Sequence, residues 1–394
     1  MNKPRKRSNA AGLSLRLAWR NIWRQKRRTW LTALAMVFSN TLLVFMIALQ
    51  LGSYEMMIDN TLRIFTGQAQ VQANGYQEAQ KMRMVVEDIS GLAQSLRNRL
   101  PKAGIAARAQ TFVMMSSKQR TYAAQLVGVE PAFEPAVSSI PGLVQQGRFF
   151  KDANAAEIVI GRVMARNLVV AEGDELTFLG SGRDGSFAAG VVRVVGIFDS
   201  GTQELDRSMA LLPLAYFQEA FNMGDSGHLV VLHGGALSEL PGMMSEVRAL
   251  LSQRPGLVAL DWDTLIPGLK QAIQADMTSA WFMYGILILL VAFSVLNTQL
   301  MSVLERTREF GVIMALGVKP RRLALLVLLE TFFMALLGFL IGAGLGGLVT
   351  AWFAHAGFVY PGMDQMAAKF NLPAAIYPSL EPMSVLLEIG RAHV

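Results

Sequence analysis

The chain contains no cysteine, and only 16% of its 394 residues are charged. Without cysteine, a disulfide scaffold, cysteine-ligated zinc and thiol catalysis are excluded. A soluble domain carries about 25% charged residues, so the low charge, together with 52% hydrophobic residues, indicates a membrane protein. Histidine is also scarce: the four residues are scattered at positions 228, 233, 355 and 393. We therefore expect no metal site.

Acidic residues are absent from the N-terminal segment, and this asymmetry predicts the orientation of the chain. Residues 1–28 hold ten basic residues and no acid, residues 304–322 hold five basic and two acidic, and residues 53–276 hold 19 basic and 23 acidic. Positive charge beside apolar segments collects on the cytoplasmic side of a membrane. We expect the first two segments in the cytoplasm and 53–276 outside. The basic N-terminus runs straight into an apolar segment, which favours a membrane over a nucleic-acid partner.

Three long runs almost free of charge predict membrane spans at 29–52, 277–303 and 323–352. Residues 30–51 carry no charge, and at about 1.5 Å per residue they extend far enough to cross the hydrocarbon core. A cleaved signal peptide has an apolar core of only about 7–15 residues, so we expect the first span to be retained. The segment between the first two spans, 53–276, is long enough to form its own core.

The segment 53–276 shows mixed periodicity. The sequence predicts strands at 68–73, 109–115, 122–129, 157–161, 175–179, 191–198 and 228–232, and helices at 162–170, 238–251 and 264–278. The fold class is therefore a membrane α-helical protein with a large α+β periplasmic domain.

The charged connector at 304–322 has the pattern of a short amphipathic helix. Val312, Ile313 and Leu316 form an apolar stripe, and Gly317 can supply a left-handed C-cap. Pro320 then prevents the helix from continuing. A simple connector between two spans does not need this pattern, so we predict that a partner docks here in the cytoplasm.

One carboxylate interrupts the third span. Glu330 lies where charge is costly, so it should face a protein interior or water. Two interpretations stay open: a partner on a neighbouring span, or a position near the interface where a nearby cation or a lipid headgroup compensates. The candidates are Asn297, Gln299 and Asn40 for the first interpretation, and Arg321 and Arg322 for the second.

Glycines follow Glu330 in the same span. Gly338, Gly342 and Gly346 are four residues apart and share one helix face. Small residues on one face let two helices approach closely. We predict that this face packs against another span, although a merely flexible glycine-rich helix would show the same composition.

Both ends of the chain invite specific expectations. Residues 1–28 predict a basic amphipathic helix in the headgroup region, with a simple stop-transfer flank as the alternative. Residues 353–381 read as a periplasmic loop, and 382–394 as the start of a truncated fourth span. The last seven residues match, when back-translated, the start of a common sequencing adapter, so we expect a non-native tail from about Ile389.

No stretch of the sequence carries a complete catalytic or nucleotide-binding pattern. Residues 142–149 have the glycine spacing of a phosphate-binding loop but lack its Lys-Ser/Thr pair. Residues 224–227 resemble a serine nucleophile only superficially, because the adjacent His228 cannot supply triad geometry. We expect a chain that is not an enzyme and binds no cofactor.

The stretch 305–317, ERTREFGVIMALG, resembles the signature of FtsX/MacB-type permeases of ABC transporters. Residues 18–28 resemble the family's N-terminal amphipathic helix, and 147–197 resemble its periplasmic core domain. The resemblance implies a four-span permease subunit, here with three spans and a truncated fourth, that works as a dimer. It also implies that a partner ABC ATPase binds and hydrolyses the ATP. The coupling residues would be Glu305, Arg306, Arg308, Glu309, Phe310, Gly311, Ala315, Leu316 and Gly317.

Within the family, the size of the ectodomain and a separate ATPase favour the lipoprotein-releasing, LolC/LolE-like branch. The partners would then be the ATPase, a second permease subunit in a homo- or heterodimer, membrane lipids, a lipoprotein substrate and a periplasmic chaperone. A MacB-like efflux component and an FtsX-like regulator of cell-wall hydrolases are the alternatives. All three place the chain in the bacterial inner membrane and none involves nucleic acid.

Overall fold

The computed structural model describes residues 20, 26–363, 367 and 373–379, which divide into two compact units. The membrane unit takes Met1–Ser53, Ile273–Phe358 and Ala375–Val394, and the second unit, here called the β-domain, takes Tyr54–Ala272 with Val359–Ala374. The expected N-terminal interfacial helix lies almost wholly outside the described residues. The expected start of a fourth span and the tail beyond it lie outside them altogether.

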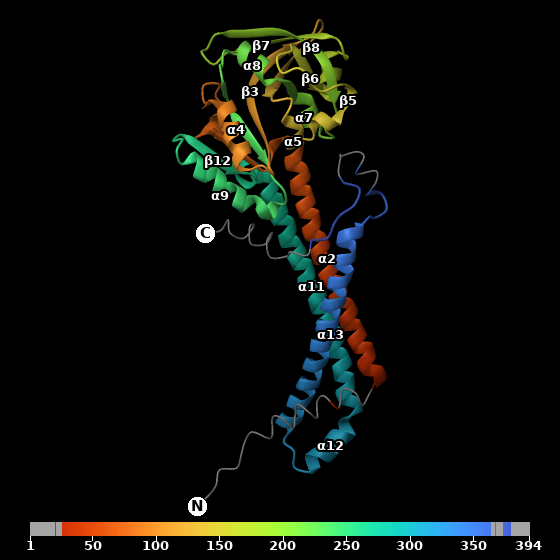
Figure 1. Cartoon of the computed structure of the whole chain (residues 1–394). Helices are drawn as coiled ribbons and strands as arrows, with labels where there is room; N and C mark the ends of the chain where they lie inside the picture. Colours follow the sequence, from red (N-terminus) through yellow and green to blue (C-terminus); the bar gives the residue numbers. More distant parts are fainter. Residues whose placement is uncertain (1–19, 21–25, 364–366, 368–372, 380–394) are drawn as a thin grey trace, which may run out of the picture. The chain divides into compact units, whose positions relative to one another are not determined.

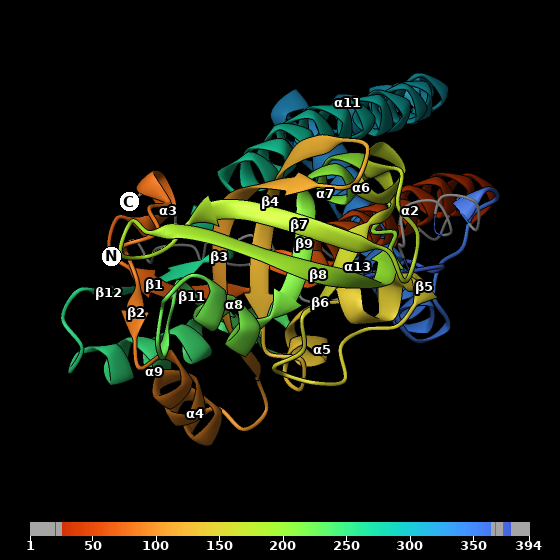
Figure 2. The same ribbon diagram turned by 90° about the horizontal axis from the view of Figure 1, so that it is seen from above.

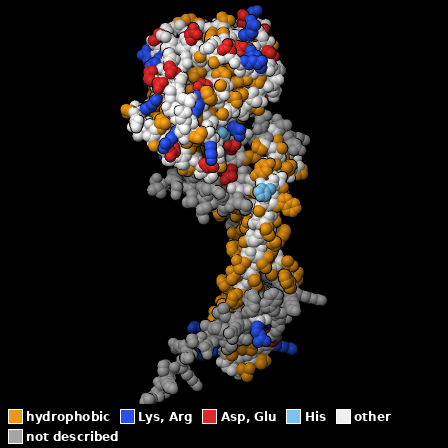
Figure 3. All heavy atoms as spheres, in the orientation of Figure 1, with side chains coloured by type: hydrophobic (Ala, Val, Ile, Leu, Met, Phe, Trp, Pro, Cys, Tyr) orange, Lys and Arg blue, Asp and Glu red, His pale blue; other side chains and the backbone are white. Residues whose placement is uncertain are grey.

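Among the described residues, three helices are long and apolar enough to cross a membrane. They are α2 (Lys26–Thr61), α11 (Pro267–Glu305) and α13 (Pro320–Ala356), with the short α12 (Thr307–Ala315) between the last two (Figure 1). Hydrophobic side chains cover the surfaces of these helices, whereas Lys, Arg, Asp and Glu are spread over the surface of the β-domain (Figure 3). This distribution is typical of helices that face lipid.

The first helix continues past the point where the sequence placed the end of the span. Helicity persists from residue 52 to Thr61 and then through a π-helical turn, η1 (Leu62–Thr66). The reason is a second apolar face: Tyr54, Ile58 and Leu62 are spaced four residues apart and are all buried in the β-domain. The helix therefore runs across residue 53, where we expected the ectodomain to start, and the β-domain begins at Tyr54 within it.

The β-domain is built on one sheet. Its strands are β1 (Ala69–Ala73), β3 (Gly104–Ser116), β4 (Thr121–Val129), β5 (Val144–Gly147), β6 (Glu157–Gly161), β7 (Glu175–Ser181), β8 (Phe187–Phe198), β9 (Met209–Pro213), β11 (Leu229–His233) and β12 (Leu257–Asp261), with a separate pair β2 (Val86–Glu87) and β10 (Ser226–Gly227). Its helices are α3 (Tyr76–Ala79), α4 (Ile89–Arg99), α5 (Glu134–Val137), α6 (Arg162–Leu168), α7 (Gln203–Ser208), α8 (Leu214–Ala220), α9 (Leu240–Leu251) and α10 (Trp262–Leu265), with 3-10 turns η2 (Ile140–Leu143) and η3 (Leu237–Glu239).

Strand pairing closes part of this sheet on itself. β3 pairs with β4, β4 with β9, β9 with β6, β6 with β8, β8 with β7, and β7 returns to the far end of β3. The near end of β3 pairs instead with β11, from which β1 and β12 continue the sheet. Figure 2 shows the β7–β8 hairpin lying across the other strands. The 13-residue strand β3 therefore belongs to both parts and links them.

Three strands of this sheet, β5, β9 and β12, were not predicted. β9 is buried at all five positions, so its sequence Met-Ala-Leu-Leu-Pro shows no alternation between apolar and polar residues. β12 is half-buried throughout and shows no alternation either. The predicted helix at 264–278 is divided: α10 ends at Leu265, and α11 begins at Pro267.

His228 and Tyr76 are buried in the β-domain and lie against each other. The Nδ1 of His228 accepts the Gln110 N–H at 2.9 Å, and its ring stacks on Tyr76 at 5.1 Å. Burial lowers the pKa of His228 to about 4 and raises the pKa of Tyr76 to about 12. Both groups are therefore neutral at physiological pH, and His228 has the role of a core residue.

Candidate functional site

The charged connector at 304–322 contains a short helix and a turn. α11 ends at Glu305, α12 spans Thr307–Ala315, and α13 begins at Pro320. Arg306 separates the first two helices with φ −95° and ψ 10°. Arg306 thus leaves helical geometry between α11 and α12, where its side chain contacts Glu330 of α13.

The end of α12 follows the capping pattern that the sequence suggested. Gly317 has a φ of +91°, its N–H donates to the Met314 carbonyl at 2.9 Å, and the Val318 N–H donates to the Ile313 carbonyl at 3.3 Å. These two bonds form a Schellman motif, which satisfies the last carbonyls of a helix. Glycine suits this position because its left-handed backbone disfavours side chains with a Cβ.

Glu330 has a cationic partner that the sequence candidates did not include. Nη1 of Arg306 lies 3.0 Å from Oε2 of Glu330, and both side chains are largely buried, at 13% and 10% exposure. Nε of Arg306 also contacts Oε2 of Glu309 at 3.4 Å, and its guanidinium lies 5.1 Å from the centroid of the Phe310 ring. Arg306 thus connects the start of α12 to a buried position on α13.

Hairpin symmetry could have pointed to this pair. Arg306 and Glu330 are the same number of residues away from Val318, on opposite sides of the turn. Antiparallel helices joined by a tight turn place such residues at the same level. Among the candidates drawn from the sequence, Gln299 lies 3.9 Å from the sulfur of Met334 and Asn40 lies against Gly342.

α12 presents a distinct outward face. Phe310 is buried at 6% exposure, whereas Val312 and Leu316 are exposed at 63% and 80%. Arg308, Val312 and Leu316 follow one another at four-residue spacing, and we call this set the α12 ridge. Of the predicted coupling residues, Glu305, Arg308, Glu309, Gly311, Ala315, Leu316 and Gly317 are exposed, Arg306 is half-buried and Phe310 is buried.

The three predicted glycines of α13 lie against α2. A Cβ on Gly338 would come within 2.6 Å of the Met36 Cβ, one on Gly342 within 2.6 Å of the Asn40 Cβ, and one on Gly346 within 2.8 Å of the Val44 Cβ. The Thr41 hydroxyl also donates to the Gly342 carbonyl at 3.1 Å. The contacts repeat every four residues on both helices, so the two backbones approach closely along a whole face.

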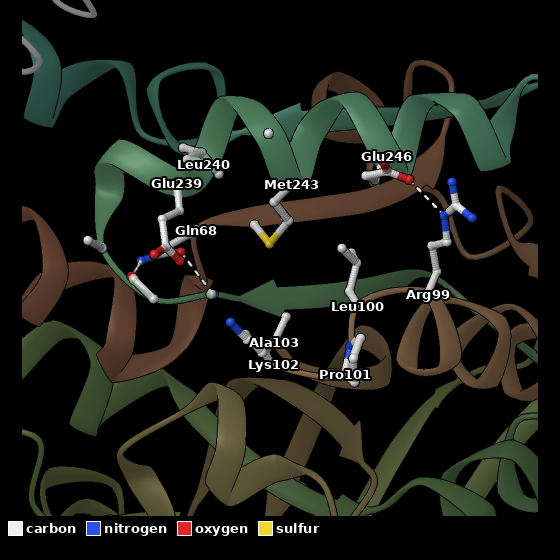
Figure 4. Close-up of a pocket in the computed structure, with 14 residues that line it drawn as sticks. Gln68, Arg99, Leu100, Pro101, Lys102, Ala103, Glu239, Leu240, Met243 and Glu246 are labelled. Carbon is white, nitrogen blue, oxygen red and sulfur yellow. Dashed lines mark hydrogen bonds and ion pairs between the residues drawn. The ribbon is translucent and has the colours of Figure 1, made fainter.

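The β-domain holds a cavity of about 340 Å³ beside α9. Figure 4 shows Met243 and Leu240 of α9 on one side and Leu100 to Ala103 on the other. Its buried amide, Gln68, is already bonded to the Gly234 N–H and the Gly235 carbonyl, at 2.9 and 3.0 Å. At its rim Arg99 pairs with Glu246 at 2.7 Å. Gln68, Arg99 and Glu246 are thus already engaged in hydrogen bonds or an ion pair within the domain. No cluster of metal-ligating side chains occurs in the described part of the chain.

A helical hairpin with an exposed charged connector, together with an α/β domain inserted in the sequence between two span helices, defines the class of protein: a membrane protein with a large domain outside the membrane. Residues 29–239 match the MacB-like periplasmic core domain, and residues 281–389 match the FtsX-like permease C-terminal domain. The first match covers more than half of the chain, and the chain therefore belongs to the MacB-like periplasmic core domain family. The resemblance inferred from residues 305–317 and the expected fold class are confirmed.

Individual relatives are distant. The macrolide export ATP-binding/permease protein MacB of Nitrosomonas europaea is 24% identical over 352 residues, which are 86% of this chain and 52% of that protein. The lipoprotein-releasing system transmembrane protein LolC of Xylella fastidiosa is 24% identical over 241 residues, 59% of this chain and 57% of that protein. The crystal structure of the periplasmic region of MacB from Actinobacillus actinomycetemcomitans aligns with a TM-score of 0.39 at 16% identity, covering 54% of this chain and 94% of that one.

The chain spans about half the length of the curated relatives it matches. It is a permease of the type represented by FtsX, MacB and LolC.

Gly342→Ala should lower the free energy of unfolding of the membrane unit by about 1–3 kcal/mol. The new methyl group would lie 2.6 Å from the Asn40 Cβ and 2.8 Å from the Val37 carbonyl oxygen. Gly344→Ala is the matched control, since a Cβ there meets nothing within 4 Å. Unfolding by titration with SDS measures both. Equal stability of the two variants would contradict close packing at Gly342.

A double-mutant cycle of Arg306→Gln and Glu330→Gln should give a coupling energy of about 1–3 kcal/mol in the same assay, because each single variant leaves a largely buried partner unpaired. Arg308→Gln, at an exposed position, should change stability by no more than about 0.5 kcal/mol. Strictly additive effects of the two single variants would show that the pair does not hold the hairpin together.

Proposed function

We propose that this chain is the permease subunit of an ABC transporter and that it transmits ATP-driven movement from a cytoplasmic ATPase to the β-domain. The observation that carries this proposal is the α12 ridge: two apolar side chains and a cation exposed on a helix whose other face is held to α13 through Arg306 and Glu330. A surface this apolar on a short connector suits a partner protein. A displacement of α12 would be transmitted to α13 through the largely buried Arg306–Glu330 ion pair.

The orientation follows the charge asymmetry. The basic N-terminus and the α12 region would face the cytoplasm, where an ATPase finds ATP, and the net acidic β-domain would face the periplasm. ATP hydrolysis belongs in this proposal to the ATPase, since neither the sequence nor the described residues contain a nucleotide-binding pattern. A dimer with a second permease subunit, homologous or identical, completes the expected assembly.

For the substrate, we propose a lipoprotein released from the inner membrane, by analogy with the LolC relative. A substrate already at the outer face of the membrane needs movement of a periplasmic domain rather than a pore. Efflux is the second candidate, favoured by the larger share of this chain that the MacB relative covers. A lipoprotein co-purified with the chain would support the first, and a periplasmic adaptor protein the second. A co-purified cell-wall hydrolase would indicate the FtsX-like regulator instead.

Three substitutions test the coupling surface. Leu316→Ser should reduce binding of the ATPase by about tenfold, because a largely exposed leucine at an interface contributes about 1–2 kcal/mol. Glu309→Lys reverses the charge beside Arg306, and Gly317→Val strains the cap at φ +91°. Both should uncouple ATP hydrolysis from output while the β-domain stays folded. ATPase rate and substrate release are measured together in proteoliposomes.

Phe187→Ser is the matched control, because Phe187 is nearly as exposed as Leu316, at 76% against 80%, but lies in the β-domain. The control should bind the ATPase like the unmodified chain. If Leu316→Ser and Glu309→Lys retain full binding and full coupling, α12 is not the docking surface.

A further inference from the structure

The carbonyl end of α2 is enclosed by the β-domain. Helix ends leave their last carbonyls without intrahelical partners, yet each carbonyl of η1 has a donor here. The Leu62 carbonyl accepts the Gly67 N–H at 2.8 Å, and the Arg63 carbonyl accepts the Ser139 N–H at 2.7 Å. The remaining three accept side-chain donors: Ser138 Oγ to Ile64 at 3.0 Å, Arg108 Nη1 to Phe65 at 2.6 Å, and Gln70 Nε2 to Thr66 at 2.8 Å.

Arg108 is the only charged donor in this set, and it is fully buried. It projects from β3 and holds the Glu134 carboxylate of α5 with two bonds, Nε to Oε2 at 3.1 Å and Nη2 to Oε1 at 2.6 Å. Both side chains have 0% exposure. The guanidinium also lies 4.0 Å from the centroid of the Phe65 ring. One arginine therefore links a strand, a short helix and the last turn of α2.

This arrangement suits positioning better than stability. A buried ion pair can often be replaced by apolar residues without loss of stability, because desolvation offsets the attraction. What apolar residues could not supply is a donor for the Phe65 carbonyl and positive charge at the negative end of the helix dipole. Lysine could not supply the planar fork that serves a carboxylate and a carbonyl together.

The junction with the other helix is built differently. α11 begins at Pro267 after a break at Ile266, where φ is −129° and ψ is 68°. Pro267 and Gly268 are exposed, and a Cβ on Gly268 would meet nothing within 4 Å. The Lys270–Asp263 pair, 2.7 Å long and part-exposed, crosses this break. Short breaks of this kind are where hinges absorb backbone rotation.

We propose that Arg108 and Glu134 fix the end of α2 rigidly in the β-domain, whereas α11 joins the same domain through a hinge at Ile266 and Pro267. In this arrangement the β-domain moves together with α2, whereas its angle to α11 can change. The significance of this asymmetry for transport depends on the proposed function, but the asymmetry itself can be tested without an ATPase.

Pairs of spin labels test it in the full chain in nanodiscs. The chain has no cysteine, so introduced cysteines are labelled specifically. Met57→Cys with Ala123→Cys reports α2 against β4, and Gln271→Cys with Ala123→Cys reports α11 against the same strand. We expect a narrow distance distribution for the first pair and a broader one for the second. Equal widths in the otherwise unmodified chain would overturn the proposal.

Arg108→Met should then broaden the distance distribution of the Met57–Ala123 pair to the width of the Gln271–Ala123 distribution. The Gln271–Ala123 distribution itself should not change. Hydrogen exchange at residues 62–67 should become about tenfold to a hundredfold faster, as expected for the loss of a charged hydrogen bond. Arg97→Met is the matched control: Arg97 also pairs with a carboxylate, Glu130, and lies over a ring, Phe133, but donates to no carbonyl of η1. It should leave the distance distributions and the exchange at residues 62–67 unchanged.

Two milder variants protect the test against a failure of Arg108→Met to fold. Arg108→Lys keeps the charge without the fork. Ser138→Ala removes the donor to the Ile64 carbonyl, together with the acceptor of the Ile140 N–H, and leaves Arg108 in place. Both should partially broaden the distance distribution of the Met57–Ala123 pair and accelerate hydrogen exchange at residues 62–67. If both variants behave like the unmodified chain, the proposed fixation of α2 is contradicted. In the presence of the ATPase, Arg108→Lys should also lower output per ATP hydrolysed, whereas Arg97→Met should not. If the unmodified chain shows no ATP-dependent output, the proposed function fails. The label distances still test whether α2 is fixed in the β-domain.

Discussion

The fold depends on how the last backbone carbonyls of α2 obtain hydrogen-bond donors. The end of any helix leaves its last carbonyls without partners within the helix. At η1 the β-domain supplies the missing donors, one for each carbonyl, from β1, β3 and the segment after α5. Farther back along the same helix, Met36, Asn40 and Val44 receive the glycine face of α13. α2 is therefore the element with which both parts of the chain make close contact.

Two arginines use the same chemistry at the two most informative helix junctions. Arg306 pairs with Glu330 and lies near the Phe310 ring; Arg108 pairs with Glu134 and lies near the Phe65 ring. Neither pair is good evidence for stability, because removing two charges from water is costly. What a guanidinium adds is direction, since its donors form a rigid planar fork. The pairs fix where a helix turns and where a helix ends, which is what the proposed transmission of movement requires.

Sequence reasoning succeeded where the signal was local. The apolar runs predicted the three helices, and residues 305–317 identified the family. The glycine spacing on α13 and the potential cap at Gly317 were visible as patterns along a single helix. All of these depend on periodicity or on residue chemistry within a few turns.

It failed where the partner is distant in sequence. Glu330 finds Arg306 across a hairpin, and Arg108 finds Glu134 and Phe65 across three elements. The strand β9 shows no alternation because both of its faces are buried. The closure of six strands into a ring was equally hidden, since it depends on β7 returning to the end of β3. The exact residue at which α11 ends was not visible either, because Arg306 leaves helical geometry beside a contact with α13.

The central claim is that ATP-driven movement reaches the β-domain through α2 and α11. The most direct test is the distance between spin labels at Met57→Cys and Gln271→Cys, near the points where the two helices join that domain, in nanodiscs that contain the ATPase. We expect the mean distance to shift when a non-hydrolysable ATP analogue is added, and to stay constant when Glu309→Lys is introduced as well. An unchanged distance on adding the analogue, in a complex that hydrolyses ATP and releases substrate, would contradict the account.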